Sequence, residues 1–113
     1  MAYLKHRGRC GLYTFTSHRL PYIPEPGPGV YVLGRIEADG RFQPLYVGQS
    51  KDVSFRLGIG ALNHDGMARA TAMGMNAVAI LRVDESMLID IETDLRHVLM
   101  PPCNLQGIGL LRD

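Results

Sequence analysis

Residues 30–48, VYVLGRIEADGRFQPLYVG, contain two apolar runs on either side of Asp39-Gly40. The runs over residues 30–37 and 43–48 are rich in β-branched and aromatic side chains, which are typical of strands. An Asp-Gly pair between two such runs favours a tight turn. The stretch therefore predicts a β-hairpin.

The segment after this hairpin carries both helix and strand signals. Ser50 or Asp52 can cap a helix that runs to about His64, although Gly58 and Gly60 weaken its middle. The later elements are expected to be a short helix over residues 67–73, a buried strand over 77–83, and a helix over 85–99 that Asp84 caps and Pro101-Pro102 ends. Together the elements predict the α+β class, with a small three-stranded, mostly antiparallel sheet flanked by helices.

The segment before the hairpin is basic and rich in proline. Residues 1–24 contain no Asp or Glu, and their four cations are Lys5, Arg7, Arg9 and Arg19. Residues 21–29, PYIPEPGPG, predict a linker, with one short strand before it near residues 11–16. We therefore expect a basic N-terminal extension over residues 1–28 and the folded domain over residues 29–113. The extension either follows a phosphate backbone or is a solvated terminus.

Composition limits the class of protein. The 113 residues are 46% hydrophobic, which is enough to bury one core, so we expect a single domain. The apolar runs fall short of the roughly 20 residues that a bilayer requires, so we expect no membrane segment. No apolar stretch follows the basic N-terminus, and we expect a cytoplasmic protein. In that compartment Cys10 and Cys103 are expected to be free thiols.

The helix predicted over residues 85–99 carries an acidic residue beside its apolar face. The apolar stripe consists of Leu88, Ile91, Leu95, Val98 and Leu99, and the polar face of Asp90, Thr93, Asp94 and His97. Glu92 lies at the edge of the stripe, where an unpaired carboxylate is costly. It either pairs with Arg96 four residues later or holds a metal ion in a cleft.

Five sequence elements occur in an order that resembles the GIY-YIG nuclease domain. They are Gly29-Val30-Tyr31, Tyr46-Val47-Gly48, Arg56, Glu92 and Pro101-Pro102-Cys103-Asn104. Residues 45–57, LYVGQSKDVSFRL, are most similar to the N-terminal nuclease domain of the excision subunit of bacterial nucleotide excision repair. In that domain, too, a lysine closely follows the YVG triplet and an arginine lies ten positions after its tyrosine. The resemblance covers residues 29–104.

The resemblance implies a metal-dependent endonuclease that hydrolyses DNA phosphodiester bonds with a single Mg²⁺ or Mn²⁺ ion. Glu92 would hold the ion, Tyr31 would orient or deprotonate the attacking water, and Tyr46 would position the phosphate. Arg56 would stabilise the charge that develops on the phosphoryl oxygens. Asn104 would bridge the C-terminal segment to the site by holding either a tyrosine or the backbone.

Three further residues are expected to bind substrate. Gly48 would let the backbone approach a phosphate closely, and Lys51 would contact a phosphate. Many family members have a histidine or lysine within about a turn of the arginine, whereas Gly60 occupies that place here. His64 can replace it only if the chain folds back at Gly58 and Gly60, and otherwise it is a solvated loop residue.

Two alternatives remain open, the first of which the departure at Gly60 permits. The chain could be a GIY-YIG scaffold that binds nucleic acid or a protein partner without cleaving. It could also be a subunit that is active only when a separate DNA-binding or targeting protein delivers DNA, because its body is too short to hold a recognition domain as well. Similarity to the excision subunit implies a role in DNA repair.

Overall fold

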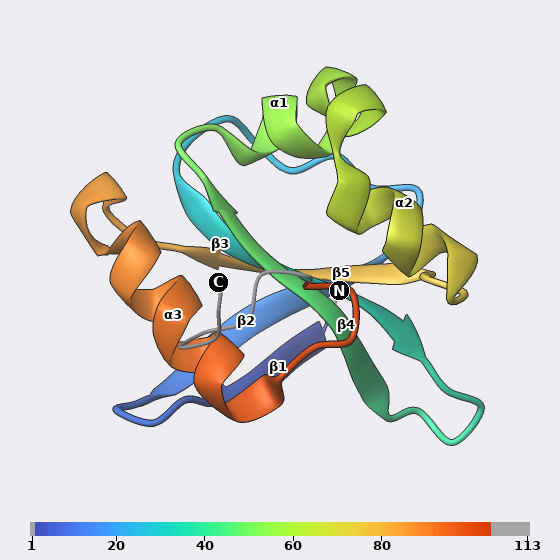
Figure 1. Ribbon diagram of the computed structural model, residues 1–113, viewed down its shortest axis with the longest axis horizontal. Helices are drawn as coiled ribbons and strands as arrows, with labels where there is room; N and C mark the ends of the chain where they lie inside the picture. Colours follow the sequence, from blue (N-terminus) through green and yellow to red (C-terminus); the bar gives the residue numbers. More distant parts are fainter. Residues whose placement is uncertain (1, 105–113) are drawn as a thin grey trace, which may run out of the picture.

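The computed structural model describes residues 2–104, and a five-stranded sheet forms its centre. The strands are β1 (Ala2–Arg7), β2 (Leu12–Arg19), β3 (Gly29–Ile36), β4 (Phe42–Ser50) and β5 (Ala77–Arg82). They lie in the order β1-β2-β5-β3-β4, and every neighbouring pair is antiparallel. The helices are α1 (Val53–Leu57), α2 (Asp65–Ala72) and α3 (Leu88–Leu99), with 3-10 helices η1 (Ile59–Asn63) and η2 (Glu85–Met87). The α+β class is confirmed, and Figure 1 shows the curled sheet with α1 and α2 at one side and α3 at another. Residues 105–113 of the predicted domain lie outside the described residues.

The predicted hairpin is formed by β3 and β4. Its turn contains Gly40, whose φ of 89° lies in the left-handed region that favours glycine. In the register, Tyr31 lies opposite Gly48, and the pairing shifts after Leu33. The shift leaves Leu45 without a partner, and both Leu45 and Tyr46 pack in the same hydrophobic core as Tyr31.

Alternate residues of β3 point into two separate cores. Tyr31 and Leu33 pack with residues of α1 and α2, whereas Val30 and Val32 pack with residues of α3. All four side chains are at most 1% exposed. The sheet is therefore covered on both faces at β3, which explains why this strand is apolar throughout and not alternating.

The expected helix from Asp52 to about His64 is shorter than predicted. Asp52 does cap α1, because its side chain accepts hydrogen bonds from backbone N–H groups of the first turn. The helix ends at Gly58, where a Cβ would lie 2.7 Å from the carbonyl oxygen of Ser54, and η1 follows. At Gly60 a Cβ would meet another carbonyl oxygen at 2.9 Å. The chain folds back here because both glycines permit this close backbone approach.

The sheet has five strands and not the expected three, because most of the predicted basic extension belongs to it. β1 and β2 form a hairpin, and β2 pairs with β5, with Thr16 opposite Ile80. Phe15 is fully buried in the core beneath α3, and Leu4 and Tyr13 pack against that core. A strand such as β5 would otherwise present unpaired backbone groups at the sheet edge. The N-terminal hairpin supplies their partners.

Helix α3 buries a carboxylate that helical periodicity assigns to its polar face. Asp94 is 8% exposed and accepts hydrogen bonds from the Tyr13 hydroxyl (2.6 Å) and the Cys10 backbone N–H (2.9 Å). The bond from Tyr13 is the main reason why the pKa of Asp94 lies below its usual value. Val98, expected on the apolar stripe, is 46% exposed. The predicted stripe was wrong at these two positions, and Asp94 is buried because the N-terminal hairpin packs against its side of the helix.

Two expectations from composition concern thiols and membranes. Both cysteines are free, with Cys10 exposed and Cys103 buried. Among the helices that the structure describes, none is long and apolar enough to cross a bilayer.

Candidate active site

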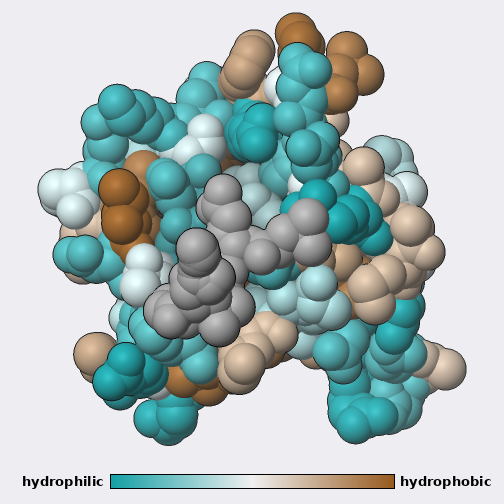
Figure 2. Space-filling model, in the orientation of Figure 1, coloured by the Kyte–Doolittle hydropathy of each residue, from teal (hydrophilic) through white to brown (hydrophobic). Residues whose placement is uncertain are grey.

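A cleft of about 480 Å³ gathers polar side chains from β4, the α1–α2 segment, α3 and Asn104 after α3. Five of the residues singled out in the sequence line it: Tyr46, Arg56, His64, Glu92 and Asn104. Figure 2 shows hydrophilic residues directly above and to the right of the centre, with apolar residues at the top and at the right edge. Three of the predicted residues, Tyr31, Gly48 and Lys51, are absent from the lining.

Tyr31 is buried behind the cleft and is bonded to a residue of its wall. Its hydroxyl lies 2.6 Å from Nε2 of His64, and the two side chains are 1% and 2% exposed. Burial raises the pKa of Tyr31, the nearby Tyr46 adds to the increase, and the positive charge of Arg56 opposes it. Tyr31 is therefore a neutral phenol at neutral pH.

His64 is a buried residue and not a solvated loop histidine. The chain reaches it by folding back through Gly58 and η1, and it forms the N-cap of α2. Its Nδ1 accepts the backbone N–H of Met67 at 3.0 Å. Nδ1 consequently carries no proton, so the neutral ring has its proton on Nε2 and donates it to the oxygen of Tyr31. Burial and the charge of Arg56 lower the pKa of His64 to about 4.

Two glycines make room for the two tyrosines. A Cβ on Gly48 would lie 2.5 Å from the hydroxyl oxygen of Tyr31, and one on Gly66 would lie 2.3 Å from the ring of Tyr46. Gly48 is buried. The structure thus gives Gly48 a steric reason within the fold, whereas the sequence suggested close approach to a phosphate.

Tyr46 is the tyrosine that faces the cleft. It is half-buried, and its ring lies 5.0 Å from that of His64 and 6.2 Å from that of Tyr31. Its pKa is raised first by burial and then by the negative charge of Glu92, while Arg56 is the strongest of the cations that lower it. The ionisation of Tyr46 is therefore coupled to the charge of Glu92.

Three arginines give the cleft its positive charge. Arg56 follows the hairpin on α1, Arg69 lies on α2, and Arg96 lies one turn after Glu92 on α3. The cleft contains two carboxylates, Glu92 and Asp65, so cations exceed anions in it. Arg69 is held in place because its Nε donates a hydrogen bond of 2.9 Å to the Cys103 carbonyl oxygen. Such a surface suits a phosphate group.

The sequence did not single out Arg69, Gln49, Asn63 or Asp65 for this cleft. A signal for Arg69 was nevertheless present, because residues 65 and 69 are one helical turn apart and fall on the same side of any helix that begins near His64. Starting the second helix at residue 65, where it begins in the structure, would have put both side chains beside His64.

Glu92 is half-buried, and burial raises its pKa while the charge of Arg96 lowers it. Within residues 2–104 it forms no salt bridge, although Arg96 also lines the cleft. The expected pair with Arg96 is therefore not formed as a direct contact. The negative charge of Glu92 therefore lacks a direct ionic partner among the described residues, and such a carboxylate can accept a cation.

The donor set permits a magnesium ion that is held mostly by water and substrate. No three His, Cys, Asp or Glu side chains gather as metal ligands in the described part of the chain. Mg²⁺ commonly uses only one or two carboxylates and completes its shell with water and phosphate oxygens. Glu92 suits this kind of coordination, because it lines the cleft and its carboxylate lacks an ionic partner among the described residues.

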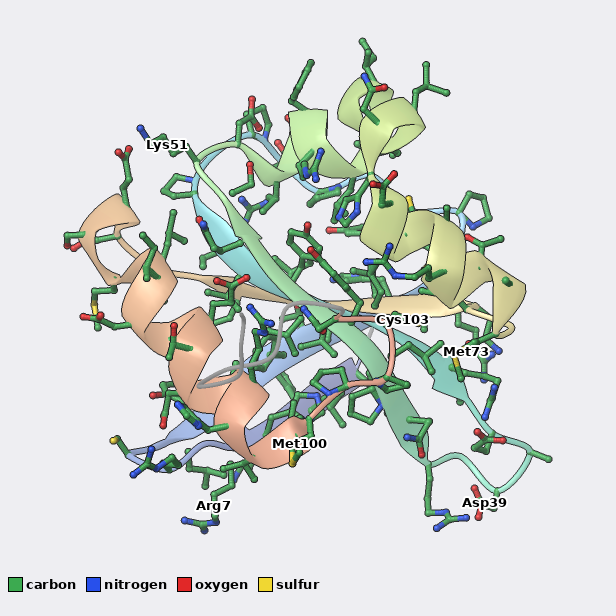
Figure 3. The ribbon with its side chains drawn as sticks, viewed as in Figure 1. Arg7, Asp39, Lys51, Met73, Met100 and Cys103 are labelled. Atoms are coloured by element: carbon green, nitrogen blue, oxygen red, sulfur yellow. The ribbon has the colours of Figure 1, made fainter. Side chains whose placement is uncertain are left out.

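Asn104 bonds to β4 within the strand, whereas Lys51 directly follows the end of the strand. The Asn104 side chain accepts the Val47 backbone N–H and donates to the Val47 carbonyl oxygen, both at 2.9 Å. It therefore holds backbone and not a tyrosine. Lys51 is exposed and lies 3.4 Å from the carboxylate of Glu85, and Figure 3 shows it directed outward at the end of β4. It lies outside the cleft lining.

The chain was compared with families, curated proteins and solved structures. No family model matches it, and neither a curated protein nor a solved structure matches it.

Proposed function

We propose that this protein is a metal-dependent endonuclease of the GIY-YIG type that hydrolyses phosphodiester bonds in DNA. The observation that carries the proposal is the convergence of Tyr46, Arg56 and Glu92 on one cleft from three separate elements. A hydroxyl, a guanidinium and a carboxylate are the groups that phosphodiester hydrolysis needs for water, phosphate and metal respectively.

In this proposal Arg56 contacts the scissile phosphate, and Arg69 and Arg96 bind the DNA backbone beside it. A guanidinium presents two parallel N–H donors to phosphate oxygens and keeps its charge at every relevant pH. These donors stabilise the negative charge that grows on the phosphoryl oxygens as the water attacks. Since the half-buried cleft excludes part of the solvent, each such contact is stronger than it would be in water.

Tyr46 orients the attacking water, because Tyr46 lines the cleft whereas the hydroxyl of Tyr31 is buried against His64. The negative charge of Glu92 disfavours ionisation of Tyr46, so any positive charge that compensates Glu92 also lowers the pKa of the tyrosine. A metal ion bound at Glu92, either Mg²⁺ or Mn²⁺, would supply Lewis-acid stabilisation of the phosphate and a lower pKa for nearby water. With its pKa lowered, Tyr46 can release its own proton to solvent, and the phenolate oxygen is then able to accept a proton from that water.

Tyr31 and His64 are positioning residues in this scheme. His64 uses both ring nitrogens within the protein, and its low pKa makes it a weak base. It fixes the start of α2, which carries Arg69, and it lies against the ring of Tyr46. Tyr31 holds His64 in that orientation through the hydrogen bond to Nε2.

The experiment compares conversion of supercoiled plasmid into nicked and linear forms by the wild type, Glu92→Gln and Asp90→Asn, with Mg²⁺ or Mn²⁺. Asp90 is an exposed carboxylate on the same helix, so its amide variant is a matched control. We expect Glu92→Gln to lose cleavage and Asp90→Asn to retain it. Equal cleavage by wild type and Glu92→Gln would remove the central assumption.

A binding scaffold that does not cleave is the second candidate, and the engagement of both nitrogens of His64 favours it. No histidine among the residues that line the cleft is then free to serve as a general base. Tight DNA binding without turnover in either metal would support this candidate. Cleavage that appears only after a DNA-binding partner is added would instead support a nuclease subunit with separate targeting.

A further inference from the structure

The N-terminal hairpin has one sheet face that no described helix covers. On β1, Leu4 and His6 point toward the core beneath α3, so the alternate residues Tyr3, Lys5 and Arg7 point to the opposite side. Tyr3 is 74% exposed, and Lys5 and Arg7 are exposed. Helices α1 and α2 pack on β3 and β4, whereas α3 reaches β1 from the core side.

The strand β2 completes this face. Thr14 lies opposite Lys5 and Thr16 opposite Tyr3. His18, two residues further along the same side of β2, is hydrogen-bonded to Thr16 at 3.1 Å. The hairpin face therefore carries a row of cations along one end and aromatic rings at the other.

The aromatic end is already stacked. The rings of His18 and Tyr22 lie parallel, with centroids 3.7 Å apart and planes within 2° of each other. Tyr22 packs against the core beneath α1 and α2, which fixes this pair from behind. Tyr3 lies on the neighbouring strand, one cross-strand diagonal from His18. Aromatic rings held in this way are flat surfaces on which bases can stack.

The charge of the face is uniformly positive. Residues 2–24 contain no Asp or Glu, so no carboxylate of the hairpin opposes Lys5 and Arg7. Figure 3 shows Arg7 extending away from the body of the protein at the end of β1. A polyanion complements this charge, and a single strand of nucleic acid also supplies bases for the rings.

We propose that the outer face of the β1–β2 hairpin binds single-stranded DNA, with bases stacked on Tyr3 and His18 and phosphates beside Lys5 and Arg7. The inference deepens the proposed nuclease function, on which it rests for the choice of DNA as the polymer. It names the substrate as DNA with an unpaired segment. A fully paired duplex hides its bases and cannot use the aromatic rings.

The test measures binding of a fluorescent oligothymidylate to the full chain by anisotropy, in EDTA and over a series of salt concentrations. We expect Tyr3→Ala to weaken binding by about tenfold, the loss that corresponds to one stacked base. Tyr3→Phe keeps the ring and retains near wild-type affinity. Lys5→Gln with Arg7→Gln lowers the slope of log affinity against log salt by about 0.7 for each phosphate that the protein no longer neutralises.

Arg19→Gln is the matched control, because Arg19 is an exposed cation on β2 whose position alternates with that of His18 and so points to the other sheet face. We expect it to leave affinity and salt slope close to wild type. An effect of Arg19→Gln equal to the effect per residue of Lys5→Gln with Arg7→Gln, no effect of Tyr3→Ala, or equal affinity for a blunt duplex would each overturn the inference. Tighter binding of an acidic protein than of oligothymidylate to this face would also overturn the inference. Because binding in EDTA does not depend on cleavage, failure of the nuclease proposal and failure of this one give different results.

Discussion

The hydroxyl of Tyr31 lies 2.6 Å from Nε2 of His64, although 33 residues separate them in the chain. The bond is buried and joins the central hairpin to the start of α2. His64 also accepts the backbone N–H of Met67 at Nδ1, which fixes the tautomer of the histidine ring. The same bond ties the histidine to the start of the helix that carries Arg69. The Tyr31–His64 hydrogen bond is the basis of the first prediction.

Tyr31→Phe leaves the Nε2–H of His64 without its acceptor. A buried donor without a partner costs about 1–3 kcal/mol, so we expect the free energy of unfolding to fall by that amount. Urea denaturation measures it. Tyr3→Phe removes a hydroxyl from a side chain that is 74% exposed and should change nothing. Equal stability of the two variants would mean that the Tyr31–His64 bond contributes nothing to the fold.

Glu92→Gln should lower the pKa of Tyr46. The negative charge of Glu92 is the second cause of the raised value, after burial, and the amide removes it while keeping the shape of the side chain. An NMR titration of labelled tyrosine ring carbons follows the ionisation. Asp90→Asn on the outer side of α3 serves as the control. A pKa of Tyr46 that stays the same or rises in Glu92→Gln would contradict the coupling.

Gly48→Ala should destabilise the protein by about 1–3 kcal/mol, the usual cost of overpacking, because the new Cβ would lie 2.5 Å from the Tyr31 hydroxyl oxygen. Combining it with Tyr31→Leu shortens the side chain that it meets. We expect the double variant to be more stable than the sum of the two single effects predicts, by at least about 0.5 kcal/mol. Strict additivity in denaturant titrations would show that the two residues do not clash.

The protein should lose stability as the pH falls below about 6.5, the pKa of an unfolded histidine. His6 is buried between Phe15 and Phe42, its Nε2 has no hydrogen-bond partner within the described residues, and burial lowers its pKa. The unfolded chain therefore takes up a proton at a higher pH than the folded protein does, so unfolding is favoured as acid is added.

His6→Leu should make this loss of stability smaller, which chemical denaturation at several pH values between about 7 and 4 would reveal. His64, whose pKa is lowered to about 4, accounts for part of the remaining slope. A substitution at His97 on α3 is the comparison. If His6→Leu and wild type lose stability in parallel, burial of His6 does not contribute to acid sensitivity.

Local sequence patterns were sufficient for the elements that neighbouring residues specify, although they did not give the pairing partners of these elements. The hairpin around Asp39-Gly40, the cap at Asp52 and the strand β5 all follow from neighbouring residues. The hairpin β1–β2 did not, because basic residues occupy its uncovered face and its partner strand β5 begins at residue 77. Strand pairing over such a distance leaves no local signal.

The candidate site shows the same division. Tyr46, Arg56 and Glu92 stood out through their spacing, and they line one cleft. The burial of His64 depended on how the chain turns at Gly58, which no pattern specifies. The position of Asp94 depended on Tyr13, 81 residues away, so a helical projection assigned it to the wrong face.

The side chain of Asn104 pairs with both backbone groups of Val47, as a neighbouring strand would, and the Cys103 N–H donates to the carbonyl oxygen of Leu45 at 2.8 Å. These hydrogen bonds occupy the outer edge of β4, which is the last strand on that side of the sheet. An open edge invites the strands of other molecules to join it. The amide of Asn104, which lines the cleft, thus also protects the protein from self-association, and its removal would make a concentrated solution prone to aggregate through β4.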